Sequence, residues 1–182
     1  MKKKFTKLPL GFALLFVGIL LFIGHTKGGS EENNYTFANE PVQIEGLSNP
    51  GEEEKLPVKI IIPTLSINLD VKKANVVNGF WEVFSDLAAW GTGSGLPGKP
   101  GNQVIFAHAR EGLFLPLKNV RVGMSIYILT DDNWYGYNVK EIKEVYPNQT
   151  EVISPTNDET LTLYTCSGFQ DSKRLIVIAK RN

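Results

Sequence analysis

Three residues that could carry out acyl transfer through a thioester lie at the ends of short apolar segments of this chain. The single cysteine, Cys166, follows the alternating segment 160–165, and Arg174 opens another apolar segment eight residues later. His108, one of only two histidines, ends a third apolar segment, 103–108. A thiol is a nucleophile, an imidazole exchanges protons near neutral pH, and a guanidinium is a fixed cation that can hold an oxyanion. Together they supply the groups that thioester chemistry needs.

The position of Cys166 argues against its being only a small buried hydrophobe, which is the usual state of a lone cysteine. The strand-like pattern breaks directly after it into Ser167 and Gly168, which indicates a turn. Alternation places Cys166 on the same face as Thr162 and Tyr164, with the leucines between them on the other face. We therefore interpret Cys166 as a nucleophile at a strand end.

His108 and Arg174 are interpreted as its partners. A loop-like sequence follows His108, so its imidazole is expected at a partly exposed rim, whereas the other histidine, His25, is interpreted as incidental. Residues 167–173 join Cys166 to Arg174. If the two flanking strands pair as a hairpin, the guanidinium returns beside the thiol, where a cation would favour the thiolate.

Four segments resemble signatures of the sortase family. Residues 162–166, Thr-Leu-Tyr-Thr-Cys, fit the family pattern T-L-x-T-C, and Arg174 falls where the family's arginine does. Residues 101–108 are similar to G-N-x-V-I-x-G-H, with Ala107 in place of the usual glycine. Residues 62–69 resemble the segment I-P-x-L-x-I-x-L that begins the family's domain. Because all four occur in the family's order and spacing, the resemblance is specific.

This resemblance, which covers about residues 57–181, implies a fold and a reaction. The implied fold is all-β, a closed eight-stranded barrel with one or two short helices. The implied enzyme is a cysteine transpeptidase of the bacterial surface. Cys166 would attack a sorting signal of the Leu-Pro-x-Thr-Gly type on another secreted protein, Arg174 would steady the oxyanion, and His108 would protonate the leaving amine. An amine from a peptidoglycan precursor or a pilin lysine would then resolve the thioester.

The resemblance also bears on ligands. Thr165 and Ala107, next to the reactive cysteine and histidine, are expected to bind the substrate. No cofactor or metal is predicted, since acidic loop residues are more often solvated than ligating. The acidic residues that would be candidates for calcium are Asp131, Asp132, Asp158 and Glu159.

The distribution of apolar segments predicts the same fold class. Short segments separated by Pro, Gly, Asn and Asp are typical of small barrels and sandwiches. A single helical turn is predicted at 85–90, with Ser85 as its cap, and another at 111–119, broken by Pro116. Residues 91–101, with five glycines and two prolines, predict a surface loop. The expected strands are 58–62, 67–71, 79–84, 103–107, 124–130, 134–145, 160–165 and 174–180.

The N-terminal part predicts a membrane anchor. Residues 1–7 hold four lysines and no acid, and residues 8–24 are uncharged and mostly apolar, about 26 Å long as a helix. This pattern predicts a cytoplasmic basic tail, one transmembrane span and an extracellular remainder. A cleaved signal peptide is the competing interpretation, although no small-x-small cleavage site is evident after Gly24. Residues 25–55 then form a flexible tether, and 56–182 the catalytic domain.

Composition and residue order limit the other possibilities. Apolar residues make up 42% of the 182, enough for one real core, and no broad basic patch indicates nucleic acid. One cysteine excludes an internal disulfide and a multi-cysteine zinc site. Papain-like proteases place cysteine before histidine, the reverse of this order, and the H-G-C-x-R cluster of L,D-transpeptidases is missing. Two alternatives stay open: a membrane-anchored β-barrel binding or adhesion module whose cysteine is inert, and a sortase-like enzyme that mainly hydrolyses its acyl-enzyme.

Overall fold

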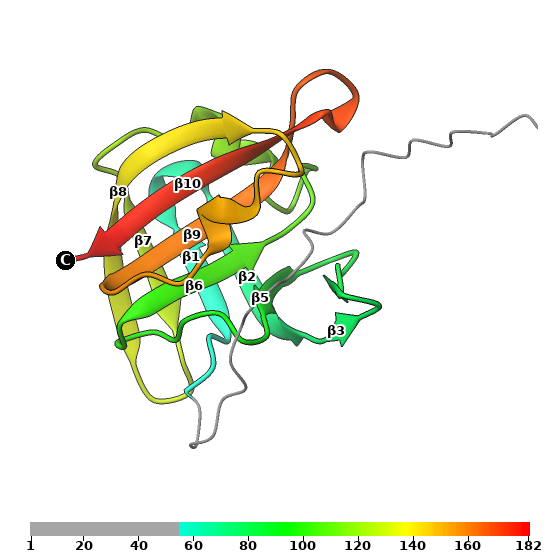
Figure 1. Ribbon diagram of the computed structural model, residues 1–182. Helices are drawn as coiled ribbons and strands as arrows, with labels where there is room; N and C mark the ends of the chain where they lie inside the picture. Colours follow the sequence, from blue (N-terminus) through cyan, green and yellow to red (C-terminus); the bar gives the residue numbers. More distant parts are fainter. Residues whose placement is uncertain (1–54) are drawn as a thin grey trace, which may run out of the picture. The chain divides into compact units, whose positions relative to one another are not determined.

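Short apolar and alternating segments form strands throughout residues 55–182, the part of the chain that the computed structural model describes (Figure 1). The strands are β1 (Lys59–Ile62), β2 (Ile67–Ala74), β3 (Val76–Val77), β4 (Phe80–Trp81), β5 (Ala88–Gly91), β6 (Gly101–Phe106), β7 (Ser125–Leu129), β8 (Trp134–Val145), β9 (Glu159–Ser167) and β10 (Lys173–Arg181). Single 3₁₀ turns connect some of them: η1 (Pro63–Leu65), η2 (Leu115–Asn119), η3 (Thr150–Ile153) and η4 (Phe169–Asp171).

Eight of these strands close into a barrel. Their order around it is β1-β2-β5-β6-β9-β10-β8-β7, while β3 and β4 form a separate two-stranded hairpin. Closure leaves no strand edge of the barrel unpaired, which is how small all-β domains satisfy their backbone groups. The predicted all-β class and the eight-stranded closed barrel are confirmed.

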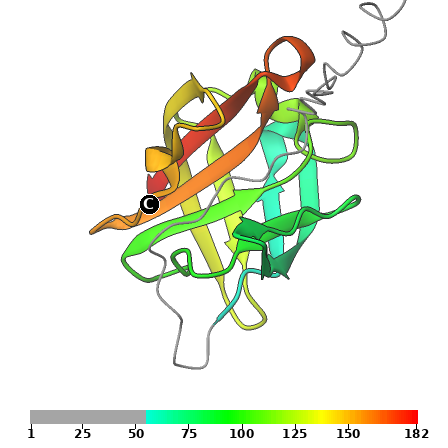
Figure 2. The ribbon, with the colours of Figure 1, turned by 45° about the vertical axis from the view of Figure 1, so that its right-hand side comes forward.

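The pairing of β6, β9 and β10 decides which residues meet. β9 runs parallel to β6 and antiparallel to β10, so β6 and β9 end where β10 begins. In Figure 1 this end lies on the side away from the marked C-terminus. Figure 2 shows the loop between β9 and β10 standing clear of the barrel strands. The ends of three strands are thus brought together from distant parts of the sequence.

Two hydrophobic clusters hold this sheet, one on each of its faces. The interior cluster fills the barrel and includes Ile105, Leu161 and Leu163. A second group, which we call the outer cluster, packs the other face against the β3–β4 hairpin and η3. The buried members of the outer cluster are Ala74, Trp81, Ala89, Val104, Phe106, Val145, Ile153, Tyr164 and Ile176. Because both faces are covered, nearly every residue of β6 and most residues of β9 are buried, the polar ones included.

Several local expectations were wrong. The helical turn expected at 85–90 is not formed, because Ala88–Gly91 is instead the barrel strand β5. All four of its residues are buried, and pairing with β2 and β6 outweighs the helix propensity of alanine. Segment 79–84 contributes only Phe80–Trp81 as strand. The loop 91–101 is not wholly at the surface, because Ser94 is buried and its hydroxyl accepts from the N–H of Val104 at 3.1 Å.

In the second predicted helical segment, Pro116 lies inside the first turn of η2 and does not break it. This position suits proline, because the first turn of a helix leaves its N–H groups without intrahelical partners. Within 55–182 no helix is long and apolar enough to cross a membrane. The predicted basic tail, the anchor 8–24 and nearly all of the tether lie outside the described residues.

Gly91 is a position where the fold tolerates no side chain. A methyl group there would collide with the ring of Trp81, which is 1% exposed and donates from Nε1 to the carbonyl of Thr92 at 3.0 Å. We expect Gly91→Ala to lower the free energy of unfolding by about 1–3 kcal/mol, measured by urea denaturation. The matched control is Gly136→Ala, whose methyl group would approach closely only the flexible side-chain end of Asn182 and would make an ordinary contact with Trp134. Equal losses in both variants would contradict this account.

Candidate active site

Cys166 and Arg174 lie side by side on the outer face of the barrel. The β9–β10 ladder pairs their Cα positions directly. Side chains alternate along β9, so that Leu163 joins the interior cluster and Tyr164 the outer cluster. Along β10, Arg174 shares its face with Ile176, another member of the outer cluster. The hairpin expected from the sequence therefore forms and returns the arginine to the cysteine.

His108 is held at the same end of the sheet. The N–H of Ala107 extends the β6–β9 ladder by donating to the carbonyl of Tyr164 at 3.4 Å. His108 is the next residue, and its own carbonyl accepts from the N–H of Phe114 at 3.0 Å, which folds the following loop back. Its side chain is half-buried, as is that of Cys166. An imidazole with this exposure can exchange protons with a bound ligand.

Two threonines of the Thr-Leu-Tyr-Thr-Cys segment fasten β9 to β6. The hydroxyl of Thr165 donates to the carbonyl of Ala107 at 2.8 Å, and the hydroxyl of Thr162 donates to Oδ1 of Asn102 at 2.7 Å. Both threonines are buried, at 3% and 0% exposure respectively. Since Ala107 precedes His108, the first of these bonds directly couples the cysteine strand to the histidine.

Asn102 extends the same network to a third element. Its Nδ2 donates to the carbonyls of Val152 at 3.2 Å and Ser154 at 3.0 Å. These residues belong to the connection between β8 and β9 around η3, so the amide anchors that connection against the sheet. In the sequence Asn102 is only one position of the pattern over 101–108, and its role depends on these folded partners.

An aromatic layer lies beneath the reactive residues. Trp81 stacks on Phe106 with ring centroids 5.6 Å apart, and Phe106 contacts Tyr164 at 5.4 Å. Phe106 stands two residues before His108, and Tyr164 two residues before Cys166. Each of these two candidate residues therefore follows an aromatic anchor by two positions, and alternation alone could have identified both anchors.

Arg174 is almost fully buried, at 1% exposure. Its Nη1 donates to the carbonyl of Asp171 at 2.9 Å and to the carbonyl of Lys173 at 3.0 Å. A planar guanidinium held by two backbone carbonyls keeps a fixed direction, which an exposed lysine would not. The adjacent Lys173 instead forms an ion pair with Glu144 at 3.5 Å, so only one of the two neighbouring cations serves the site.

Burial dominates the protonation of the site. It raises the pKa of Cys166, with the Arg174 charge lowering it and the Asp171 charge raising it further. Burial also lowers the pKa of His108, helped by the charge of Arg110 and opposed by that of Asp171. At neutral pH most molecules therefore hold a thiol and a neutral imidazole. The sequence-based expectation that a nearby cation favours the thiolate is right in sign, but burial outweighs it.

Thr165 and Ala107, the residues expected to bind substrate, are both buried and bonded to each other. Their contact with a substrate stays a prediction. The acidic loop residues have other partners: Asp132 pairs with Lys55, and Asp158 pairs with Lys180 at 2.7 Å. Residues 55–182 contain no group of three or more His, Cys, Asp or Glu side chains that could hold a metal ion.

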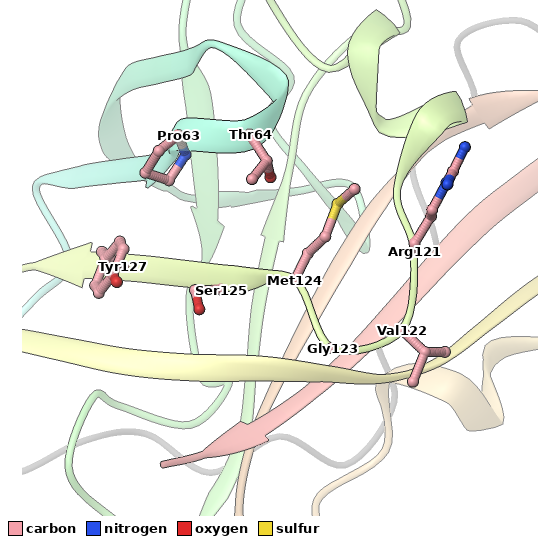
Figure 3. Close-up of a pocket in the computed structure, with 8 residues that line it drawn as sticks. All are labelled: Pro63, Thr64, Arg121, Val122, Gly123, Met124, Ser125 and Tyr127. Atoms are coloured by element: carbon pink, nitrogen blue, oxygen red, sulfur yellow. The ribbon is translucent and has the colours of Figure 1, made fainter.

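A depression of about 560 Å³ lies elsewhere, where η1 meets the start of β7 (Figure 3). β1 and β7 neighbour each other across the barrel from β9 in the strand order. None of the lining residues is a predicted site residue, so we assign this depression no part in the chemistry of Cys166. Its lining residues are Pro63, Thr64, Arg121, Val122, Gly123, Met124, Ser125 and Tyr127.

Comparison with known proteins places the barrel in one family. The family model described as Sortase domain matches residues 60–182. Sortase A of Streptococcus agalactiae is 28% identical over 170 residues, covering 85% of this chain and 66% of that protein. Sortase A of Listeria monocytogenes is 28% identical over 165 residues, covering 83% and 70%. These matches therefore span about two thirds of the relatives' own length.

A solved structure gives the same result. A lid mutant of sortase A from Corynebacterium diphtheriae superposes with a TM-score of 0.61 at 28% identity, covering 72% of each chain. The three reactive residues proposed from the sequence thus lie on a barrel that this family shares.

The opposing effects of burial and charge on Cys166 can be measured. We expect the pH midpoint of its alkylation by iodoacetamide to lie above that of an ordinary cysteine, and to rise further in Arg174→Gln, because the arginine charge lowers the thiol pKa. Lys173→Gln, which removes the adjacent cation paired with Glu144, should leave the midpoint unchanged. An unchanged midpoint in Arg174→Gln would contradict the assignment.

Proposed function

Because this chain belongs to the sortase family of cysteine transpeptidases, we propose that it cleaves a C-terminal sorting signal on another secreted protein and transfers the acyl group to an amine. The observation that carries this proposal is the direct pairing of Cys166 with the buried Arg174, at the strand end next to His108. A nucleophile, a fixed cation and an acid/base within one strand end match the needs of acyl transfer.

In the first half-reaction, the Cys166 thiolate attacks the carbonyl carbon of the scissile peptide bond. The carbonyl π electrons move to oxygen, and the resulting oxyanion is stabilised by the Arg174 guanidinium. The tetrahedral intermediate then collapses, the C–N bond breaks, and the His108 imidazolium gives its proton to the departing amine. The product is a thioester on Cys166 and a neutral imidazole on His108.

In the second half-reaction, an incoming amine attacks the thioester. Neutral His108 takes the proton from the attacking nitrogen, and the C–S bond breaks to return the Cys166 thiolate. A new amide bond has formed, and the starting protonation state of the site is restored. Since thiolate and imidazolium are both minor forms at neutral pH, we propose that the reaction starts from the small fraction of molecules in which both are present.

We propose a sorting signal of the Leu-Pro-x-Thr-Gly type as the substrate. Support comes from apolar side chains that pack at the edge of the outer cluster, among them Val83, Phe84 and Val152, which remain half-buried. A leucine and a proline could bury against such a surface on the face that carries Cys166. The acceptor amine would come from a peptidoglycan precursor or from a pilin lysine.

We also propose that the enzyme works at the outer face of the cell membrane. The uncharged segment 8–24 would span the bilayer, and residues 25–55 would tether the barrel to it. A tether of about 30 residues keeps the site within a small volume above the membrane, which raises the effective concentration of membrane-bound partners. A barrel that only binds ligands is the alternative, but it gives no reason to bury an arginine beside the cysteine.

Trapping the acyl-enzyme tests the reaction. Full-length protein in detergent is incubated with a pool of sorting-signal peptides, and its intact mass is recorded. We expect a thioester adduct on the parent and none on Cys166→Ala, with triglycine converting the adduct into an amide product. His108→Ala should slow adduct formation by about 100-fold or more. No adduct from any peptide, or the same adduct on Cys166→Ala, would overturn the proposal.

The bond between Thr165 and Ala107 predicts a further difference. Thr165→Val and Thr162→Val each remove one buried hydroxyl, and each should lower stability by about 1–3 kcal/mol. Only Thr165→Val loosens the residue next to His108, so we expect it to slow acylation about tenfold relative to Thr162→Val. The check is the single-turnover acylation rate at a temperature where both variants are fully folded, and equal rates would contradict the assignment.

A further inference from the structure

The connection between β9 and β10 has an unusual backbone. Gln170 and Asp171 are consecutive and both adopt left-handed conformations, with φ of 52° and 58°. Residues with a β-carbon adopt this conformation at a cost in free energy, although aspartate and asparagine tolerate it better than most. Such strain persists only where surrounding contacts hold it, and it is concentrated at functional sites.

The contact that holds Asp171 is made with Arg174. The Asp171 carbonyl accepts from Nη1 of Arg174 at 2.9 Å, while the Asp171 N–H donates to the carbonyl of Gly168 at 3.3 Å. A turn of Asp171 out of the left-handed region would swing this carbonyl away from the guanidinium. The left-handed conformation and the direction of the buried arginine are therefore coupled.

The charge of Asp171 acts on the site. Asp171 is half-buried, whereas Gln170 is exposed and Phe169 is 84% exposed. Its carboxylate acts electrostatically on both His108 and Cys166, raising the pKa of each. Two cations have the opposite effect: Arg110 lowers the pKa of His108, and Arg174 lowers the pKa of Cys166.

We infer that Asp171 is a positioning residue for acyl transfer, whose carbonyl oxygen is held by the left-handed backbone and orients the Arg174 guanidinium. The inference rests on the proposed transpeptidation, in which Arg174 stabilises the oxyanion and the His108 imidazolium protonates the leaving amine. In addition, the Asp171 charge favours that imidazolium and disfavours the Cys166 thiolate, so it sets a balance between the acid and the nucleophile. Asp171 carries no signal in the sequence, because its spacing matches no pattern and its conformation is fixed only by the folded loop.

Three substitutions separate the two parts of this role. Asp171→Asn removes the charge and keeps a residue that tolerates the left-handed region. Asp171→Gly also removes the charge and adopts that region freely. Asp171→Ala removes the charge and penalises the conformation, so the carbonyl should leave Arg174. Asp70→Asn is the matched control, since it removes a carboxylate that pairs with Lys59 on the β1–β2 ladder, away from the site.

The first readout is the pH profile of kcat/KM in the full-length protein. We expect both limbs to move to lower pH in Asp171→Asn and Asp171→Gly, because the carboxylate raises the pKa of both titrating groups. Asp171→Ala should show the same shift and an additional loss of kcat of about tenfold or more. A profile of Asp171→Asn that superposes on the parent would overturn the carboxylate role, and equal kcat in the Ala and Gly variants would overturn the carbonyl role.

The second readout needs no peptide substrate. The pH midpoint of Cys166 alkylation should fall in Asp171→Asn and stay unchanged in Asp70→Asn, provided that thermal melts show both variants folded. If no acyl-enzyme forms with any peptide but this midpoint falls, the proposed function fails while the action of Asp171 on the thiol stands. If the midpoint does not fall, the inference about the carboxylate fails whatever the substrate.

Discussion

The parallel pairing of β6 with β9 is the constraint on which the site depends. It aligns the strand that ends before His108 with the strand that carries Cys166. No turn or local contact could bring these two residues together, because they are 58 positions apart in the sequence. Two buried threonine hydroxyls lock the register, and the aromatic layer of Trp81, Phe106 and Tyr164 covers the same face. A slip of one residue would turn the cysteine into the barrel interior.

Burial determines both the direction of the Arg174 guanidinium and the protonation states of Cys166 and His108 in the absence of substrate. The guanidinium is withdrawn from water and held by backbone carbonyls, so its direction is fixed before a substrate arrives. The same burial keeps the thiol protonated and the imidazole neutral, which slows the reaction of the thiol with oxidants and alkylating agents in solvent. Slow labelling of Cys166 at neutral pH is therefore compatible with an enzyme and does not by itself indicate an inert cysteine.

The sequence predicted those parts of the fold and the candidate site that follow from the alternation and spacing of residues. Alternation identified most barrel strands and the shared face of Cys166 and Tyr164, and the short connection predicted the hairpin that returns Arg174. It failed for β5, whose four buried residues show no alternation and contain two alanines. The left-handed conformation of Asp171 and the burial of Arg174 were equally inaccessible, because both arise from tertiary contacts at residues that have no such preference of their own.

The long sequence separation across the β6–β9 pair also has a kinetic consequence. Strands so far apart pair only after the intervening loop has closed, and such non-local contacts form late in folding. The histidine, the arginine and the cysteine therefore meet only when the barrel is nearly complete. Until then the Cys166 thiol is solvated, and neither the proposed acid nor the proposed oxyanion partner lies beside it.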